Sequence, residues 1–358
     1  MNGFYVGEHS GLDPFGHYNG TTVPLDWDLA EEYTLSDNFY SSVLDYSLPN
    51  HWHIVAGQAP AQENVTQEGG INKTKFNVST VIQYDHQYLN ESNATESIED
   101  ALARDPRVTW DYYDFPLSNY SNASSIQLNA NGTQIEHIGL AYAYFNPQAA
   151  KYESYTSEFD SHFVNNTRFY SDARAGRLPE LSWLIPPGQF SDHPPDNSTD
   201  SQAWLASVVD ALEASPDWNS SVMYITWDDY GGFYDNMDPP AVYGQQLGFR
   251  VPLLIISPYS TAGSVSHQFG YFESVLRLME WRFGLGCITK LDCEAPLPLW
   301  GFNFSGPPRA PILFPTNFSL ASYPYDSNWN ASALGPPAPY FPPEEFTYFP
   351  DGEAPDID

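Results

Sequence analysis

Short apolar runs alternate with amphipathic segments through the middle of this chain. The runs "LSWLIP" (181–186), "SVMYITW" (221–227) and "VPLLIISP" (251–258) are bounded by Pro, Gly or Asp, as buried strands are. The segment "DSQAWLASVVDALEAS" (200–215) gathers its apolar residues on one helical face, and "YFESVLRLMEWRFG" (271–284) is a second helix that ends in glycine. This order predicts an α/β fold with a mostly parallel sheet and helices on both faces.

Three other segments complete the expected organisation. "WDLAEEY" (27–33) is a short helix candidate, whereas residues 60–135 are polar and irregular and are expected to form a surface insertion or cap. From about residue 296 onward proline and aromatic residues dominate, so 301–358 is expected to be a tail that either wraps the domain or forms a stiff spacer. Residues 1–300 would then form one α/β domain.

The charge of the chain excludes several classes of partner. Among 358 residues, 13 are Lys or Arg and 45 are Asp or Glu, which gives a formal net charge of −32. This charge argues against nucleic acid or an anionic membrane as a partner. Because aromatic residues make up 16% of the chain, it reads as folded rather than as a disordered acidic chain. In an acidic medium most carboxylates would be neutral, so we expect stability to be highest at acidic pH.

Glycosylation motifs and cysteines indicate an exported protein, extracellular or at the cell surface. Cys287 and Cys293 are close in sequence, and a disulfide is the simplest interpretation of such a pair in an exported chain. No apolar leader and no run of eighteen apolar residues is visible. The fifteen N-x-[ST] motifs, which predict N-glycans, are at Asn19, Asn64, Asn72, Asn77, Asn90, Asn93, Asn119, Asn122, Asn131, Asn165, Asn197, Asn219, Asn303, Asn317 and Asn330.

Two adjacent carboxylates are the first candidate for chemistry. In "VMYITWDDYGGFYDN" (222–236), Asp228 and Asp229 follow an apolar strand, and ligands of open parallel sheets bind at the carboxyl ends of strands. Neighbouring carboxylates repel each other unless a cation is bound, so the pair is a candidate metal site. An Asp-rich turn before Gly231 and Gly232 explains the same spacing, and the spacing alone leaves both readings open.

Three further candidates come from loops and from one predicted helix. In "SLPNHWHIVAG", Ser47 lies at the start of a helix, where backbone N–H groups favour an anion, although an ordinary capping serine fits too. His193, in "QFSDHPPD" after the strand 181–186, is expected at the same sheet edge as Asp228 and is a candidate phosphate contact or acid–base group. His267 follows the strand 251–258 in the equivalent place.

Six blocks between residue 1 and about residue 313 carry a family resemblance. They are "YTLSDNFYSSVLDYSLPNHWHIVAGQ", "LSWLIPPGQFSDHPP", "SPDWNSSVMYITWDDYGGFYDNMDPP", "GFRVPLLIISPYSTAGSVSH", "ESVLRLMEWRFGL" and "FNFSGPPRAPIL". In this order they resemble the phosphoesterase family that includes bacterial phospholipases C and related acid phosphatases. The resemblance implies an alkaline-phosphatase-like α/β core that spans the expected 1–300 domain and makes it the catalytic domain. It also implies metal-assisted phosphoryl transfer with Ca, Mg, Mn or Zn.

The resemblance also assigns roles to individual residues. Ser47 becomes the nucleophile and a metal ligand, Asp228 and Asp229 bind the metal, and His193 contacts the phosphoryl group. Asn50 and His267 are expected to bind substrate. Hydrolysis would then proceed through a phosphoseryl intermediate.

Two departures from the family pattern qualify these roles. Relatives begin with an E-N-[RH]-[ST]-F-D block whose Glu and Asn complete the metal site, and this block is absent here, so we expect the chain to be an N-terminally shortened form. Phe272 stands where many relatives carry another histidine. The sequence therefore favours a secreted, glycosylated phosphoric ester hydrolase acting on a phosphomonoester or a phospholipid. The alternatives are a catalytically impaired surface glycoprotein and, more weakly, an acid-stable binding module.

Overall fold

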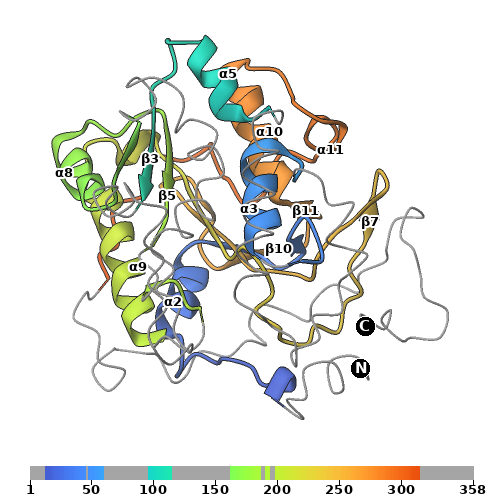
Figure 1. The fold of residues 1–358 in the computed structure, drawn as a ribbon. Helices are drawn as coiled ribbons and strands as arrows, with labels where there is room; N and C mark the ends of the chain where they lie inside the picture. Colours follow the sequence, from blue (N-terminus) through green and yellow to red (C-terminus); the bar gives the residue numbers. More distant parts are fainter. Residues whose placement is uncertain are drawn as a thin grey trace, which may run out of the picture.

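The computed structural model describes the central part of the chain (Figure 1). Most of the expected cap and the end of the expected tail lie outside the described residues. Within them, helices and strands alternate, and the α/β class predicted from the sequence is confirmed. The described ranges are 13–45, 47–59, 96–114, 162–186, 190–193 and 198–314.

The three helices and three strands predicted from the apolar pattern all form. Within the described part of the chain, none of the helices is long and apolar enough to cross a bilayer. The helices are η1 (Asp13–Phe15), α2 (Pro24–Glu32), α3 (Ser47–Ala56), α5 (Ile98–Arg104), α8 (Arg168–Ala175), α9 (Ser198–Glu213), η6 (Trp218–Ser220), α10 (Phe272–Phe283) and α11 (Lys290–Cys293). The strands are β1 (Thr34–Ser36), β2 (Phe39–Tyr40), β3 (Trp110–Asp114), β4 (Phe163–Asn165), β5 (Leu181–Leu184), β6 (Met223–Thr226), β7 (Ala241–Val242), β8 (Gln245–Gln246), β9 (Leu253–Ile256), β10 (Ser264–Ser266) and β11 (Gly270–Tyr271).

The topology of the central sheet differs from the mostly parallel sheet expected from the sequence. The central sheet has the order β10-β1-β9-β6, in which β9 is antiparallel to both β1 and β6. The chain between β6 and β9 forms the β7–β8 hairpin rather than a crossover helix, so it returns in the opposite direction. Strand β5 pairs in parallel with β3 in a separate sheet, β4-β3-β5. The prediction that 181–186 and 221–227 share one sheet is therefore wrong.

Strand β9 holds the layers together. All four of its residues are buried, and they alternate between two faces. Leu254 and Ile256 pack in the cluster formed with α2 and α9, whereas Leu253 and Ile255 pack with Phe272 of α10. Figure 1 shows the strands between α9 and α2 on one side and α3 and α10 on the other. The predicted covering of both sheet faces by helices is thus confirmed.

One edge of the central sheet collects the ends of three strands. The aligned row Thr226, Leu253, Ser36 and Ser266 marks the end of β6, the start of β9 and the ends of β1 and β10. Strand β10 runs opposite to β9, and it therefore brings the chain back to the edge where β6 ends. Residues that follow β6, β1 and β10 consequently leave the sheet on the same side.

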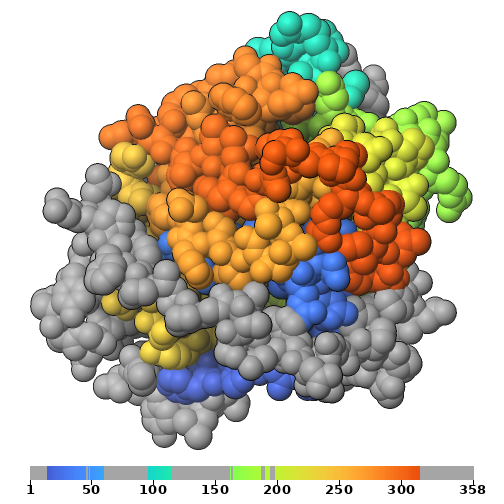
Figure 2. All heavy atoms as spheres, turned by 180° about the vertical axis from the view of Figure 1, so that it is seen from behind, coloured from blue at the N-terminus to red at the C-terminus, as the bar shows by residue number. Residues whose placement is uncertain are grey.

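The described part of the tail wraps the domain. The Trp218 indole donates to the Arg309 carbonyl at 3.1 Å, and the Phe314 N–H donates to Asp210 of α9 at 2.7 Å. The Phe314 ring is 8% exposed in the cluster around α2 and α9. Figure 2 shows this segment, in red, lying against the surface. For residues 301–314 the structure therefore decides against a free spacer.

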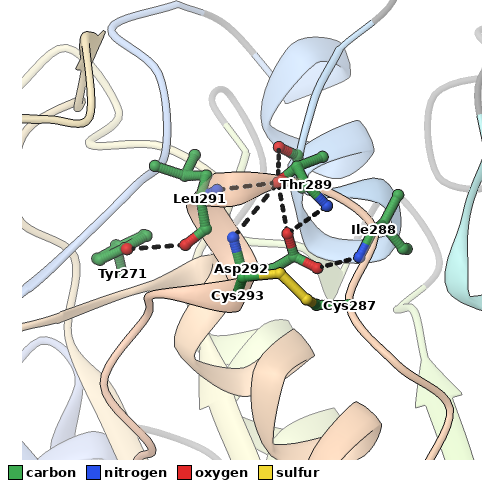
Figure 3. Close-up of a disulfide and its surroundings, with 8 residues drawn as sticks. Tyr271, Cys287, Ile288, Thr289, Leu291, Asp292 and Cys293 are labelled. Carbon is green, nitrogen blue, oxygen red and sulfur yellow. Dashed lines mark hydrogen bonds between the residues drawn. A yellow bond between two sulfur atoms is a disulfide. The ribbon is translucent and has the colours of Figure 1, made fainter.

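The predicted disulfide is present. Cys287 and Cys293 are joined across the short helix α11, with their Cα atoms 5.2 Å apart (Figure 3). Within this loop, Asp292 accepts hydrogen bonds from the N–H groups of Ile288 at 2.7 Å and Thr289 at 2.6 Å. The covalent link and these bonds fix the chain directly after α10.

Candidate active site

Ser47 begins helix α3, and the loop before it is held by Asn50. The Asn50 side chain is fully buried. Its Oδ1 accepts the N–H groups of Ser42 and Val43, and its Nδ2 donates to the carbonyls of Val43 and Asp45 at 3.2 Å. Asn50 therefore shapes the entry to the helix, because its amide is enclosed and bonded to this loop; its expected contact with substrate stays a prediction.

A buried hydrogen bond between two side chains anchors α3 against α10. His53 Nδ1 lies 2.6 Å from Glu273 Oε1, and both side chains are almost completely buried. The Ser42 hydroxyl donates to the other oxygen of Glu273 at 2.5 Å. The helix that begins with Ser47 is therefore also fixed to α10 one turn after Asn50. None of the three residues that do this was a candidate in the sequence.

Asp228 joins the end of β6 to the start of α3. Its carboxylate accepts a hydrogen bond from the Ser47 hydroxyl and lies 3.5 Å from His51 Nε2. Burial alone would raise the pKa of Asp228. The hydrogen bond and charge of His51 and the hydrogen bond from Ser47 favour the carboxylate more strongly, so the pKa is lowered. The sequence analysis missed His51, although its place four residues after Ser47 puts both on one helix face.

Asp229 makes the turn that the sequence left open. Its Oδ1 accepts the Gly231 N–H at 2.6 Å, and Gly231 and Gly232 adopt φ values of 66° and 79°, which favour glycine. Burial and the neighbouring Asp228 raise the pKa of Asp229. The bond from the Gly231 N–H and the charges of His193 and His51 lower it, but by less. The turn uses one carboxylate oxygen, so it is compatible with metal binding through the other.

His193 lies close enough to Asp229 to act on it electrostatically. It is exposed, and it follows Asp192, whose φ of 64° is left-handed. Asp192 accepts bonds from the Ser201 hydroxyl and, at 3.3 Å, from the indole of Trp227, the residue before Asp228. This anchor brings His193 to the end of β6 even though β5 belongs to another sheet.

His267 lies on the same sheet edge but not beside the carboxylates. Strands β1 and β9 separate β10 from β6, which corresponds to roughly 14 Å at the usual spacing between strands. The His267 ring is bonded through Nδ1 to both oxygens of Asp37, at 2.8 and 2.9 Å. The structure therefore brings Ser47, His51, Asp228, Asp229 and His193 together and leaves His267 apart.

A second polar group ties the loops of this edge together. The Arg250 guanidinium binds Asp235 through two bonds of 2.7 Å and donates to the Asp37 carbonyl at 3.2 Å. The planar fork of arginine suits such a paired contact. The sequence analysis missed this clamp because the three residues lie far apart in the chain.

The donors present are those that a hard divalent cation prefers. Two carboxylates and a hydroxyl supply oxygen ligands, and a cation beside them would relieve the repulsion between Asp228 and Asp229. Among the described residues, no group of three or more His, Cys, Asp or Glu side chains is arranged to hold a metal. Phe272, in the place of a family histidine, is buried against Phe39 and offers no ligand.

Comparison with curated proteins finds phospholipases C. Phospholipase C B of Mycobacterium tuberculosis is 27% identical over 328 residues, covering 82% of this chain and 57% of that protein. The non-hemolytic phospholipase C of Pseudomonas aeruginosa is 23% identical over 343 residues, covering 83% and 44%. The chain thus spans about half the length of the curated relatives it matches.

One solved structure and one family model also match this chain. A Vibrio parahaemolyticus protein described as belonging to the alkaline phosphatase superfamily covers 80% of this chain and 66% of its own. Its 13% identity and TM-score of 0.39 are too low to support an argument. A sequence model described as the Phosphoesterase family matches residues 1–286. With most of its length matched in this way, the chain belongs to the phosphoesterase family.

Proposed function

We propose that this protein hydrolyses phosphoric esters by attack of the Ser47 hydroxyl on phosphorus. The observation that carries the proposal is the meeting of Ser47, His51 and Asp228 at the junction of α3 and β6. Asp229 and His193 lie next to this junction. The similarity to phospholipases C supports the same reaction class.

Each residue of the junction has a defined task in this proposal. Ser47 begins α3, so free N–H groups and the helix dipole favour a bound phosphoryl group beside its hydroxyl. Asp228 accepts the hydroxyl hydrogen bond and so orients the oxygen for in-line attack. His51 keeps Asp228 ionised, and the exposed His193 donates to a phosphoryl oxygen or to the leaving group. Water then hydrolyses the phosphoseryl intermediate.

Asp228, Asp229 and Ser47 are the residues of this chain that would hold a divalent metal ion. Such an ion supplies neutralisation of phosphoryl charge and lowers the pKa of the attacking hydroxyl. Carboxylate ligands suit Ca, Mg or Mn, and Zn is also compatible with Asp ligands.

Removal of metal tests the proposal. Chelation followed by desalting is expected to reduce hydrolysis of a phosphomonoester and of phosphatidylcholine by about 10²-fold or more. Separate addition of Ca, Mg, Mn and Zn should restore activity with one preferred ion. If the folded chain hydrolyses neither ester with any of these ions between pH 3 and 8, the catalytically impaired glycoprotein is the correct reading.

The position of His267 predicts a role away from phosphorus. At roughly 14 Å from β6 it would contact the leaving group of a large substrate rather than the phosphoryl group. His267→Ala is expected to raise KM for phosphatidylcholine about 5-fold, because one distal contact is lost, and to leave a small phosphomonoester unaffected. Gln268→Ala, at the exposed neighbouring position, is the control. An equal loss with both substrates would place His267 at the reaction centre instead.

We also propose that the protein is exported. The disulfide between Cys287 and Cys293 is typical of an oxidising compartment, and the many glycosylation motifs agree with it. Mass spectrometry of the protein secreted by its native host would test this.

A further inference from the structure

An exposed ladder of aromatic rings lies where the tail meets the domain. The rings of Phe302 and Phe304 are stacked, with centroids 5.3 Å apart and an interplanar angle of 10°. Tyr259 packs against Phe304 at 5.4 Å. Phe304 is nevertheless 67% exposed, which makes it the most exposed large hydrophobic side chain among the described residues. Tyr259, Phe302 and Phe304 together form an aromatic ladder.

Asn303 lies within the aromatic ladder and belongs to an N-x-[ST] motif. Its N–H donates to the Tyr259 carbonyl at 2.8 Å, and Phe302 forms a β-bridge with Ser260, so the backbone here is fixed. Asn303 Oδ1 accepts the Ser305 N–H at 3.0 Å and the Ser305 hydroxyl. Within the described part of the chain, Asn303 Nδ2 has no hydrogen-bond partner. The reactive nitrogen is thus available on an exposed residue whose neighbours in sequence are Phe302 and Phe304.

We propose that Asn303 carries an N-linked glycan whose first N-acetylhexosamine lies on the aromatic ladder. In the modification, Nδ2 forms a bond to C1 of a polyprenyl-diphosphate-linked oligosaccharide. The bond from C1 to the diphosphate oxygen breaks, the diphosphate leaves with the electron pair, and the amide nitrogen loses a proton. The apolar C–H face of the sugar then covers the Phe304 ring, which is otherwise in water.

The other motifs in the described residues lack this combination. Asn165 accepts the same two bonds from Thr167 but is only half-exposed. Asn219 is exposed, but the neighbouring Trp218 ring is 3% exposed and cannot be covered by a sugar. Asn19 is exposed beside Tyr18, which packs on Phe233 at an angle of 67° rather than in a stack. Among these motifs, Asn303 alone is flanked in sequence by two rings that stack on each other, one of which is 67% exposed.

The test compares the full chain made in a glycosylating eukaryotic host with the same chain made in a bacterium. Glycopeptide mapping should find Asn303 occupied. Ser305→Ala, which removes the motif and keeps all three rings, should lower Tm by about 2 °C in the glycosylated protein and leave the bacterial protein unchanged. After enzymatic trimming to one sugar, an NMR contact between the acetyl methyl group and the Phe304 ring is expected.

Two variants distinguish packing of the sugar on the Phe304 ring from a general effect of glycosylation on Tm. Ser221→Ala removes the motif at Asn219 and the bond from the Ser221 hydroxyl to the Asp217 carbonyl. Because no exposed ring lies beside Asn219, any change in Tm should be the same in the glycosylated and the bacterial protein. In a Phe304→Ala background, Ser305→Ala should no longer lower Tm. The proposal is overturned if Asn303 is unmodified while Asn219 is occupied, or if the loss on Ser305→Ala persists without Phe304.

Discussion

Replacing Ser47 with alanine is expected to lower kcat for phosphoester hydrolysis by about 10⁴-fold, because the proposed phosphoseryl intermediate cannot form without its hydroxyl. The carboxylate of Asp228 would lose one hydrogen bond, but its contact with His51 remains. Substrate binding should change far less than kcat, since the helix N-terminus and His193 are retained. Single-turnover kinetics with a chromogenic phosphoester measure the chemical step directly.

Ser198→Ala is the matched control for this loss. Ser198 begins helix α9 as Ser47 begins α3, so the same substitution tests the loss of a serine at a helix N-terminus without touching the junction. It should leave kcat unchanged. Retention of more than a tenth of the activity by Ser47→Ala, with unchanged Tm, would assign the nucleophile elsewhere. Trapping of ³²P-labelled phosphoserine at Ser47 in the parent protein gives independent proof of the intermediate.

Replacing Glu280 with glutamine is expected to stabilise the protein at neutral pH and not at acidic pH. Burial, followed by the adjacent Asp292, raises the pKa of Glu280 from 4.5 to about 9, and its side chain is 1% exposed. Between these two values the folded protein holds a proton that the unfolded chain releases, so the free energy of unfolding falls as pH rises. At pH 7 the free energy of unfolding is expected to be about 3 kcal/mol lower than at acidic pH because of Glu280 alone.

Two further carboxyls act in the same direction. Burial raises the pKa of Asp26 and of Glu213 to about 7 each, so both favour the folded state most at acidic pH. The wild-type protein should therefore be most stable near pH 4 to 5. This direction agrees with the expectation from the net charge, for a different reason: the charge acts through general repulsion, whereas these groups act through individual buried sites.

Chemical denaturation at pH 4.5, 6, 7 and 8 measures this dependence. Glu280→Gln should flatten the decline in the free energy of unfolding, whereas Glu294→Gln, an exposed carboxyl after the same disulfide loop, should not. Asp292 keeps its bonds from Ile288 and Thr289 in both variants (Figure 3). Equal slopes for wild type and Glu280→Gln would show that Glu280 ionises normally in the folded protein.

The sequence predicted individual elements better than their arrangement. The helices α9 and α10 and the strands β5, β6 and β9 were predicted because each depends on its own apolar pattern. The directions of β6 and β9 were not, since an apolar run of four residues is the same whether its neighbour is parallel or antiparallel. What reverses β9 is the hairpin between the two strands, built from residues with no strong pattern.

In the candidate site, too, residues with a local sequence pattern were predicted and residues without one were not. Ser47, Asp228, Asp229 and His193 carried local signals, a helix start, a strand end or a loop, and the structure places them together. His51 carried only the signal of its spacing from Ser47, and the clamp of Arg250 on Asp235 carried no signal of its own.

By itself, then, the sequence determined the fold class, the disulfide and the acidic character, because these depend on composition and on local spacing. The roles of Ser47, Asp228, Asp229 and His193 in phosphoryl chemistry rest on the resemblance to the phosphoesterase family and stay predictions. The tertiary structure alone decided that Asn50 is enclosed, that two strands separate β10, and His267 after it, from β6, and that the 301–314 segment wraps the domain. The last two outcomes depend on contacts between segments far apart in the chain, and such a contact leaves no period in either segment. Asn50 is bonded to the loop just before its helix, and the path of an irregular loop has no period either.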